Sequence, residues 1–170
     1  MKLLSATLVA GLTAGLWAGG EERAGEKGLK PAQALEEWGD YFVGGVWTTT
    51  NARGETEEMR LEWILDRSFI RLTWKIGDTS REEIHGIDPA TGRWAIAGFD
   101  SKGRVYRGFG ESEKAGEWSY RVSGQGKDGP MSMKSRDIKR GPDEERYEIE
   151  EQIVDGKKLP PEVQTWKRKK

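Results

Sequence analysis

The side chains that could do chemistry in this sequence are one histidine and many carboxylates, because cysteine is absent. Without cysteine there can be no disulfide, no thiolate metal site and no cysteine nucleophile. His85, in the segment Glu82-Glu83-Ile84-His85-Gly86, is the single imidazole available as a general base or as a haem or metal ligand. The alternative is an ordinary strand histidine beside Glu83. No identifiable set of partner ligands accompanies His85, so we predict neither a cofactor nor a metal site.

Adjacent carboxylates do not define an acid–base site here, because acidic residues are so numerous that such pairs are expected on solvated faces. The pairs are Glu57-Glu58, Glu82-Glu83 and Glu150-Glu151. The common phosphate-binding glycine loops and the Gly-x-Ser-x-Gly nucleophile motif do not occur. The 28 basic and 29 acidic residues nearly cancel. The basic tail Lys167–Lys170 lacks a matching set of exposed aromatic residues, so we expect no nucleic-acid partner.

Aromatic residues are the second chemical resource, since the chain has eight tryptophans. They could fill the core, or they could line a lumen that binds one small apolar or amphipathic ligand. The candidate ligand-binding residues are Trp63, Trp74, Trp94, Phe109, Trp118 and Tyr120, with Arg107 and His85 as polar candidates. Glycines inside the predicted strands would either permit sharp bends or leave space in the lumen. They are Gly86, Gly98, Gly108 and Gly110.

Apolar residues recur with a period of two in the segments 59–66, 70–76, 118–123 and 146–150, which is typical of strands with one buried face. In the first segment the apolar face runs from Met59 to Leu65. Trp63 and Trp74 then point into the same interior, while Glu62 and Lys75 point to water. Nine turn signals, with Asp, Asn, Gly and Pro, separate the strands at nearly even spacing. They lie at 51–54, 66–67, 77–78, 88–92, 100–103, 114–116, 128–130, 141–143 and 155–156.

Nine short connections imply about ten antiparallel strands, and a meander of this length must curl so that its edges close. We therefore predict an all-β fold, an antiparallel up-and-down β-barrel over residues 31–168. An outer-membrane barrel is the alternative. The charged face of nearly every strand opposes it, because a barrel in lipid needs an apolar outer band.

A short helix precedes the barrel and is predicted to lie across one end of it. Pro31 suits the first helical position, and Leu35, Trp38 and Phe42 recur at spacings of three and four to form one apolar stripe. The glycines predicted to end the helix are Gly39, Gly44 and Gly45.

Residues 1–20 are typical of a secretory signal peptide, with a basic start, an apolar stretch from Leu3 to Trp17 and then Ala18-Gly19-Gly20. An uncleaved anchor is the alternative, but the apolar run is shorter than the about 20 residues that span a bilayer. No second candidate span follows, so we expect none in the mature chain. Residues 21–30 read as a flexible leader. The prediction is an exported protein, periplasmic or extracellular.

The residues after the helix, Gly44-Gly45-Val46-Trp47, resemble the Gly-x-Trp entry of the lipocalins and their calycin relatives. Over about Leu35 to Trp166 the chain is similar to a bacterial lipocalin-like family of unknown function. The segments that carry this similarity are 42–47, Glu62-Trp63-Ile64-Leu65-Asp66-Arg67-Ser68-Phe69, Gly86-Ile87-Asp88-Pro89-Ala90-Thr91-Gly92-Arg93-Trp94 and Phe99-Asp100-Ser101-Lys102-Gly103. The resemblance implies a closed calycin-type barrel with Trp47 packed at its closed end. It supplies no catalytic residues.

Three classes of function remain open for such a barrel. A binding protein would hold a small hydrophobic or amphipathic ligand in its lumen, and this is the class we favour over an enzyme. An enzyme would use the same cavity, with His85 or a strand carboxylate as the acid–base group. A packed barrel without a cavity would act through its surface.

Overall fold

The structure is a computed structural model and describes residues 28–169. Within this range one helix, α1 (Pro31–Phe42), precedes eleven strands. The strands are β1 (Val46–Thr50), β2 (Thr56–Ile64), β3 (Phe69–Ile76), β4 (Thr79–Ile87), β5 (Trp94–Asp100), β6 (Val105–Lys114), β7 (Glu117–Gly126), β8 (Gly129–Lys139), β9 (Glu144–Val154), β10 (Lys157–Leu159) and β11 (Glu162–Arg168). The predicted signal peptide lies outside the described residues. No helix of the described part is long and apolar enough to cross a membrane.

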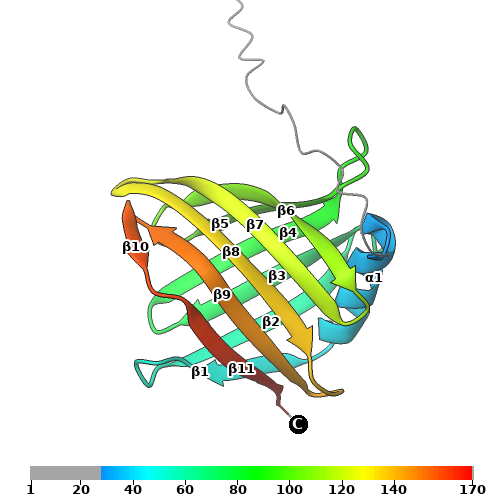
Figure 1. The fold of residues 1–170 in the computed structure, drawn as a ribbon, viewed down its shortest axis with the longest axis horizontal. Coiled ribbons are helices and arrows are strands. Elements are labelled where there is room, and N and C mark those ends of the chain that lie inside the picture. Colours follow the sequence, from blue (N-terminus) through cyan, green and yellow to red (C-terminus); the bar gives the residue numbers. More distant parts are fainter. Residues whose placement is uncertain (1–27, 170) are drawn as a thin grey trace, which may run out of the picture.

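Ten of the strands close into an antiparallel barrel with α1 at one end (Figure 1). Each strand from β1 to β9 pairs with the next, and β11 pairs with both β9 and β1. The short β10 pairs with the last part of β9. Pro160 and Pro161 separate β10 from β11, because proline has no N–H to donate to a sheet. The predicted all-β barrel of about ten strands is confirmed.

Each of the nine predicted turns lies at or beside a connection between consecutive strands. The buried face that was predicted to run from Met59 to Leu65 ends one residue of the alternation earlier, at Trp63. Leu65 was expected on the buried face, but it is 70% exposed. β2 ends at Ile64, and Leu65, Asp66 and Arg67 all have positive φ, so they turn the chain instead of continuing the pleat.

Helix α1 closes one end of the barrel through the apolar stripe that the sequence predicts. Leu35, Trp38 and Phe42 are all buried. Gly39 was expected to end the helix, but it lies inside α1, where a Cβ would come within 2.5 Å of the Trp63 and Ile70 side chains. This glycine therefore lets the helix approach the barrel wall closely.

Trp47 joins the helix to the first strand. Its side chain is fully buried, and its indole N–H donates to the carbonyl oxygen of Phe42 at 2.9 Å. The guanidinium of Arg168, on β11, lies 4.7 Å from the centre of the Trp47 ring. Trp47 thus packs at the closed end, as the resemblance to lipocalins implies.

The inward glycines create room that neighbouring rings then fill. A Cβ on Gly98 would meet the Tyr106 ring at 2.4 Å, and one on Gly110 would meet the Trp94 ring at 2.7 Å. Both glycines are paired directly with these aromatic residues across the β5–β6 ladder. The space at these two positions is therefore taken by the protein's own side chains, not left for a guest.

Candidate functional site

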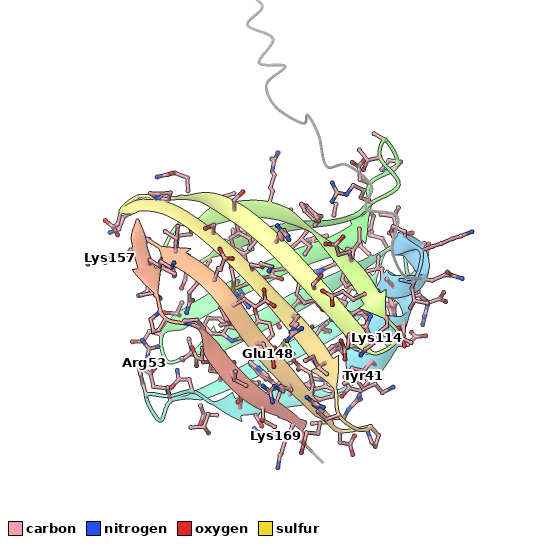
Figure 2. The ribbon with its side chains drawn as sticks, in the orientation of Figure 1. Tyr41, Arg53, Lys114, Glu148, Lys157 and Lys169 are labelled. Carbon is pink, nitrogen blue, oxygen red and sulfur yellow. The ribbon has the colours of Figure 1, made fainter. Side chains whose placement is uncertain are left out.

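A cavity of about 430 Å³ lies inside the barrel. Trp38 of α1 lines its floor, and Arg53, in the β1–β2 turn, lines it at the opposite end. Figure 2 shows Arg53 and Lys157 at the end of the barrel away from α1, and Tyr41 and Lys114 at the helix end. The volume falls within the about 300–1,000 Å³ that small-molecule sites occupy.

The wall of the cavity is apolar over much of its area. Its aliphatic and thioether residues are Met59, Leu72, Ile76, Ile96, Val122, Met131, Met133, Ile149, Ile153 and Val154, and its aromatic residues are Trp38, Trp74, Tyr106, Tyr120, Tyr147 and Trp166. Met side chains are flexible and polarisable, so they adapt to ligands of different shape. The wall is therefore suited to an apolar chain or ring.

A hydrogen-bonded chain of polar side chains crosses the β4 and β6 side of the cavity. Glu83 accepts from the Tyr106 hydroxyl at 2.8 Å, lies 3.2 Å from Arg81 and lies 2.9 Å from Nε2 of His85. Burial opposes ionisation of Glu83, but Arg81, His85 and Tyr106 together lower its pKa to about 2. Glu83 is therefore a charged and fully satisfied carboxylate.

His85 uses both ring nitrogens within this network. Nδ1 accepts from the indole N–H of Trp94 at 3.2 Å, which leaves Nε2 to carry the hydrogen that is donated to Glu83. The ring also stacks on Trp38, with centroids 4.6 Å apart. A general base or a metal ligand needs a nitrogen lone pair directed at its target. In this arrangement His85 has none to offer.

A second polar group lies on β2, β3 and β11. Glu57 accepts from the indole N–H of Trp74 at 2.8 Å and from the Gln164 amide at 3.3 Å. Gln164 in turn accepts from Trp166 at 3.1 Å. Burial raises the pKa of Glu57 above its ordinary value, although the Trp74 hydrogen bond acts in the opposite direction.

The third group lies at the floor, where β7, β8 and β9 meet α1. Asp137 accepts at Oδ2 from Trp38 Nε1, 2.9 Å away, and from the Tyr120 hydroxyl. Glu145 is 1% exposed, and within residues 28–169 the one hydrogen-bond partner of its carboxyl group is the neighbouring carboxyl of Asp137. Burial raises the pKa of both acids, most strongly that of Glu145, which Asp137 raises further.

The structure brings three of the predicted site residues to the cavity wall: Trp74, Tyr120 and His85. Trp94 and Trp118 are fully buried on the inner face but do not line the cavity. Trp63 also lies on the inner face, where it packs against Gly39 of α1. These three tryptophans belong to the packed core around the helix.

Arg107 and Phe109, also predicted for the site, do not reach the cavity. Arg107 is exposed, and Phe109 lies on the outer face with the Arg93 guanidinium 3.9 Å from its ring centre. Tyr106, Gly108 and Gly110 are the residues of β6 that face inward. Two of these inward residues are glycines and have no side chain. Phe109 lies between the two glycines, so the sequence alone suggests that the outer face of β6 is the buried one.

Four buried acids, Glu57, Glu83, Asp137 and Glu145, and the half-buried Arg81 were not predicted from the sequence. The strand alternation could have identified them, because residues two positions apart on a strand lie on the same face. Glu57 lies two residues before Met59 on the apolar face of β2, and Glu145 lies two residues before Tyr147 on that of β9. Within the described range no three His, Asp or Glu side chains lie together as a metal-binding group.

The fold and the cavity define the class of protein: a closed antiparallel β-barrel with a helix at one end and an internal cavity, consistent with a lipocalin-like fold. No family model matches the sequence, and the search of curated proteins finds no match. The cavity and its side chains are therefore the features from which a function can be inferred.

Proposed function

We propose that this protein is an exported lipocalin-like barrel that binds a small amphipathic molecule in its lumen. The observation that carries the proposal is the cavity of about 430 Å³, with an apolar wall and polar groups grouped at three places. Ligand sites typically combine a predominantly apolar lining with a few polar groups that orient the guest. A packed barrel acting through its surface would have no such space.

Export is proposed from residues 1–20 alone. Their basic, apolar and small-residue order is that of a signal peptide. N-terminal sequencing of protein recovered from the periplasm or the medium tests it, with a mature chain beginning at Gly19 or Glu21 as the expected result. Recovery of intact Met1 there would contradict cleavage.

Ligand binding is tested by filling the cavity. Val122 of β7 is 6% exposed and lines the cavity, whereas Val105 of β6 is 57% exposed on the outer face. In calorimetric titrations with 1-decanol, Val122→Phe should weaken binding about tenfold or more, because the added ring occupies the guest's space. Val105→Phe is the matched control and should leave affinity unchanged. Equal affinity in both variants, or no binding by the unaltered protein, would contradict a lumen site.

An enzymatic use of the cavity is the second candidate. His85 does not favour it, since both its nitrogens are engaged. The observation in its favour is the Asp137 and Glu145 pair, because burial raises the pKa of both acids, as it does for many catalytic carboxyl groups. Mass spectrometry of molecules that copurify with the protein separates the two candidates, since a stored ligand is recovered unchanged after incubation with the protein.

A further inference from the structure

The cavity floor contains two buried acids, Asp137 and Glu145, and no basic residue forms a salt bridge with either among residues 28–169. Glu145 is almost completely buried, and apart from the carboxyl of Asp137 neither of its oxygens has a hydrogen-bond partner among the described residues. Asp137 lies on the paired strand β8 and lines the same floor. Both of its donors, Trp38 and Tyr120, reach Oδ2, so neither of them engages Oδ1. Two adjacent buried acids without a basic partner cost stability, so their retention needs another explanation.

The other polar groups of the cavity are already matched. Glu57 accepts from Trp74 and Gln164, and Glu83 accepts from Tyr106 and pairs with Arg81. The three arginines that line the cavity each have a carboxylate within 3.2 Å: Arg53 with Glu55, Arg81 with Glu83 and Arg104 with Asp100. Among the acids that line the cavity, Glu145 at the floor is therefore the one with no donor beyond its neighbouring acid.

Two aromatic residues, Trp38 and Tyr120, line this acidic floor, and both donate a hydrogen bond to Asp137. Trp94 packs behind them, with its ring centre 5.2 Å from that of Trp38 and 5.6 Å from that of Tyr120. These rings help to exclude water from the two acids, which strengthens their attraction for a cation. The floor is therefore suited to an ammonium group rather than to an anion.

We propose that the ligand of this barrel carries a protonated amine, which binds between Asp137 and Glu145 while its apolar part lies along the cavity wall. This inference rests on the proposed ligand-binding function and adds the chemistry of the head group. Because burial raises the pKa of both acids, binding of an ammonium group is coupled to loss of a proton from the pair. A neutral hydroxyl could accept a hydrogen bond from the protonated pair but would gain no charge pairing.

The test compares three probes with the same ten-carbon chain: decylamine, 1-decanol and decanoate. Calorimetric titration of the unaltered protein at pH 7 should show decylamine binding about tenfold tighter than decanol, the gain expected from a charge-assisted hydrogen bond. Decanoate should bind more weakly than either. Binding of decanol with no preference for the amine would overturn the head-group proposal and leave the lumen function intact. Absence of binding by all three probes would overturn both.

Two isosteric substitutions test whether the two floor acids cause the preference for decylamine over decanol. Glu145→Gln should reduce the decylamine-to-decanol affinity ratio to near one, and Asp137→Asn, on the neighbouring strand, should reduce it as well. Glu57→Gln is the matched control, because it removes a buried cavity carboxylate whose oxygens are already partnered. It should keep the ratio within about threefold of the unaltered protein. A ratio preserved in both floor variants, each with an unchanged circular dichroism spectrum, would place the amine elsewhere and overturn the proposal.

Discussion

The indole N–H of Trp94 donates to Nδ1 of His85 across 3.2 Å, inside a core where both side chains are buried. Nitrogen-15 NMR should therefore show neutral His85 as the Nε2–H tautomer, with an unprotonated Nδ1. In Trp94→Phe the constraint on the tautomer is removed, so a mixture is expected. An Nδ1–H tautomer in the unaltered protein would contradict the assigned network.

Replacing Trp47 by Ala should destabilise the protein by about 3–5 kcal/mol, the usual result of emptying a large aromatic site in a core. The substitution removes packing against α1 and leaves the Phe42 carbonyl without its indole donor. Urea denaturation measures the change. Val163→Ala, at a 57% exposed position of β11, is the control and should change stability by less than about 0.5 kcal/mol. A loss below about 1 kcal/mol at Trp47 would contradict its structural role.

Glu145→Gln should stabilise the ligand-free protein at neutral pH, because the raised pKa of Glu145 couples folding to proton uptake and the glutamine amide does not titrate. The pKa of Glu145 is raised in the folded state. Protonation of Glu145 therefore contributes favourably to the free energy of unfolding at low pH, and this contribution is lost as pH rises through the folded pKa. The advantage of the variant should therefore be larger at pH 8 than at pH 5.

Urea denaturation at the two pH values measures this difference. Glu144→Gln is the control, because its side chain is exposed on the same strand. An advantage for Glu145→Gln that shrinks as pH rises would contradict the assigned direction of the pKa shift.

Trp74→Ala should weaken binding of 1-decanol by about 1–3 kcal/mol, the value of one large buried apolar contact. Trp74 lines the cavity, whereas the neighbouring Lys75 is exposed on the outer face. Lys75→Ala should therefore change the affinity by less than about 0.5 kcal/mol. Calorimetric titration compares the two variants, and equal effects at both positions would contradict the facing of β3.

The strand alternation predicted the barrel because period two and turn chemistry are local properties of the chain. Trp74 and Tyr120 lie on the cavity wall, the face to which the strand alternation assigns them. Phe109 was misplaced because the inward neighbours in β6 are glycines, which give no apolar signal. The acidic floor needed tertiary information, since Asp137 and Glu145 become adjacent only when β8 pairs with β9, and Trp38 reaches Asp137 from a helix 99 residues away.

The barrel closes along β1 and β11, which are joined through Trp47–Arg168 and Thr48–Lys167, whereas β2 and β3 pair from Glu57–Ile76 to Ile64–Phe69. The hydroxyl of Thr49 adds a bond to the carbonyl of Thr165, 116 residues later. Closing so long a loop costs chain entropy that each hairpin avoids. Refolding should therefore proceed hairpin by hairpin, with β11 docking on β1 in the slowest step, as expected when the decisive contacts are distant in sequence.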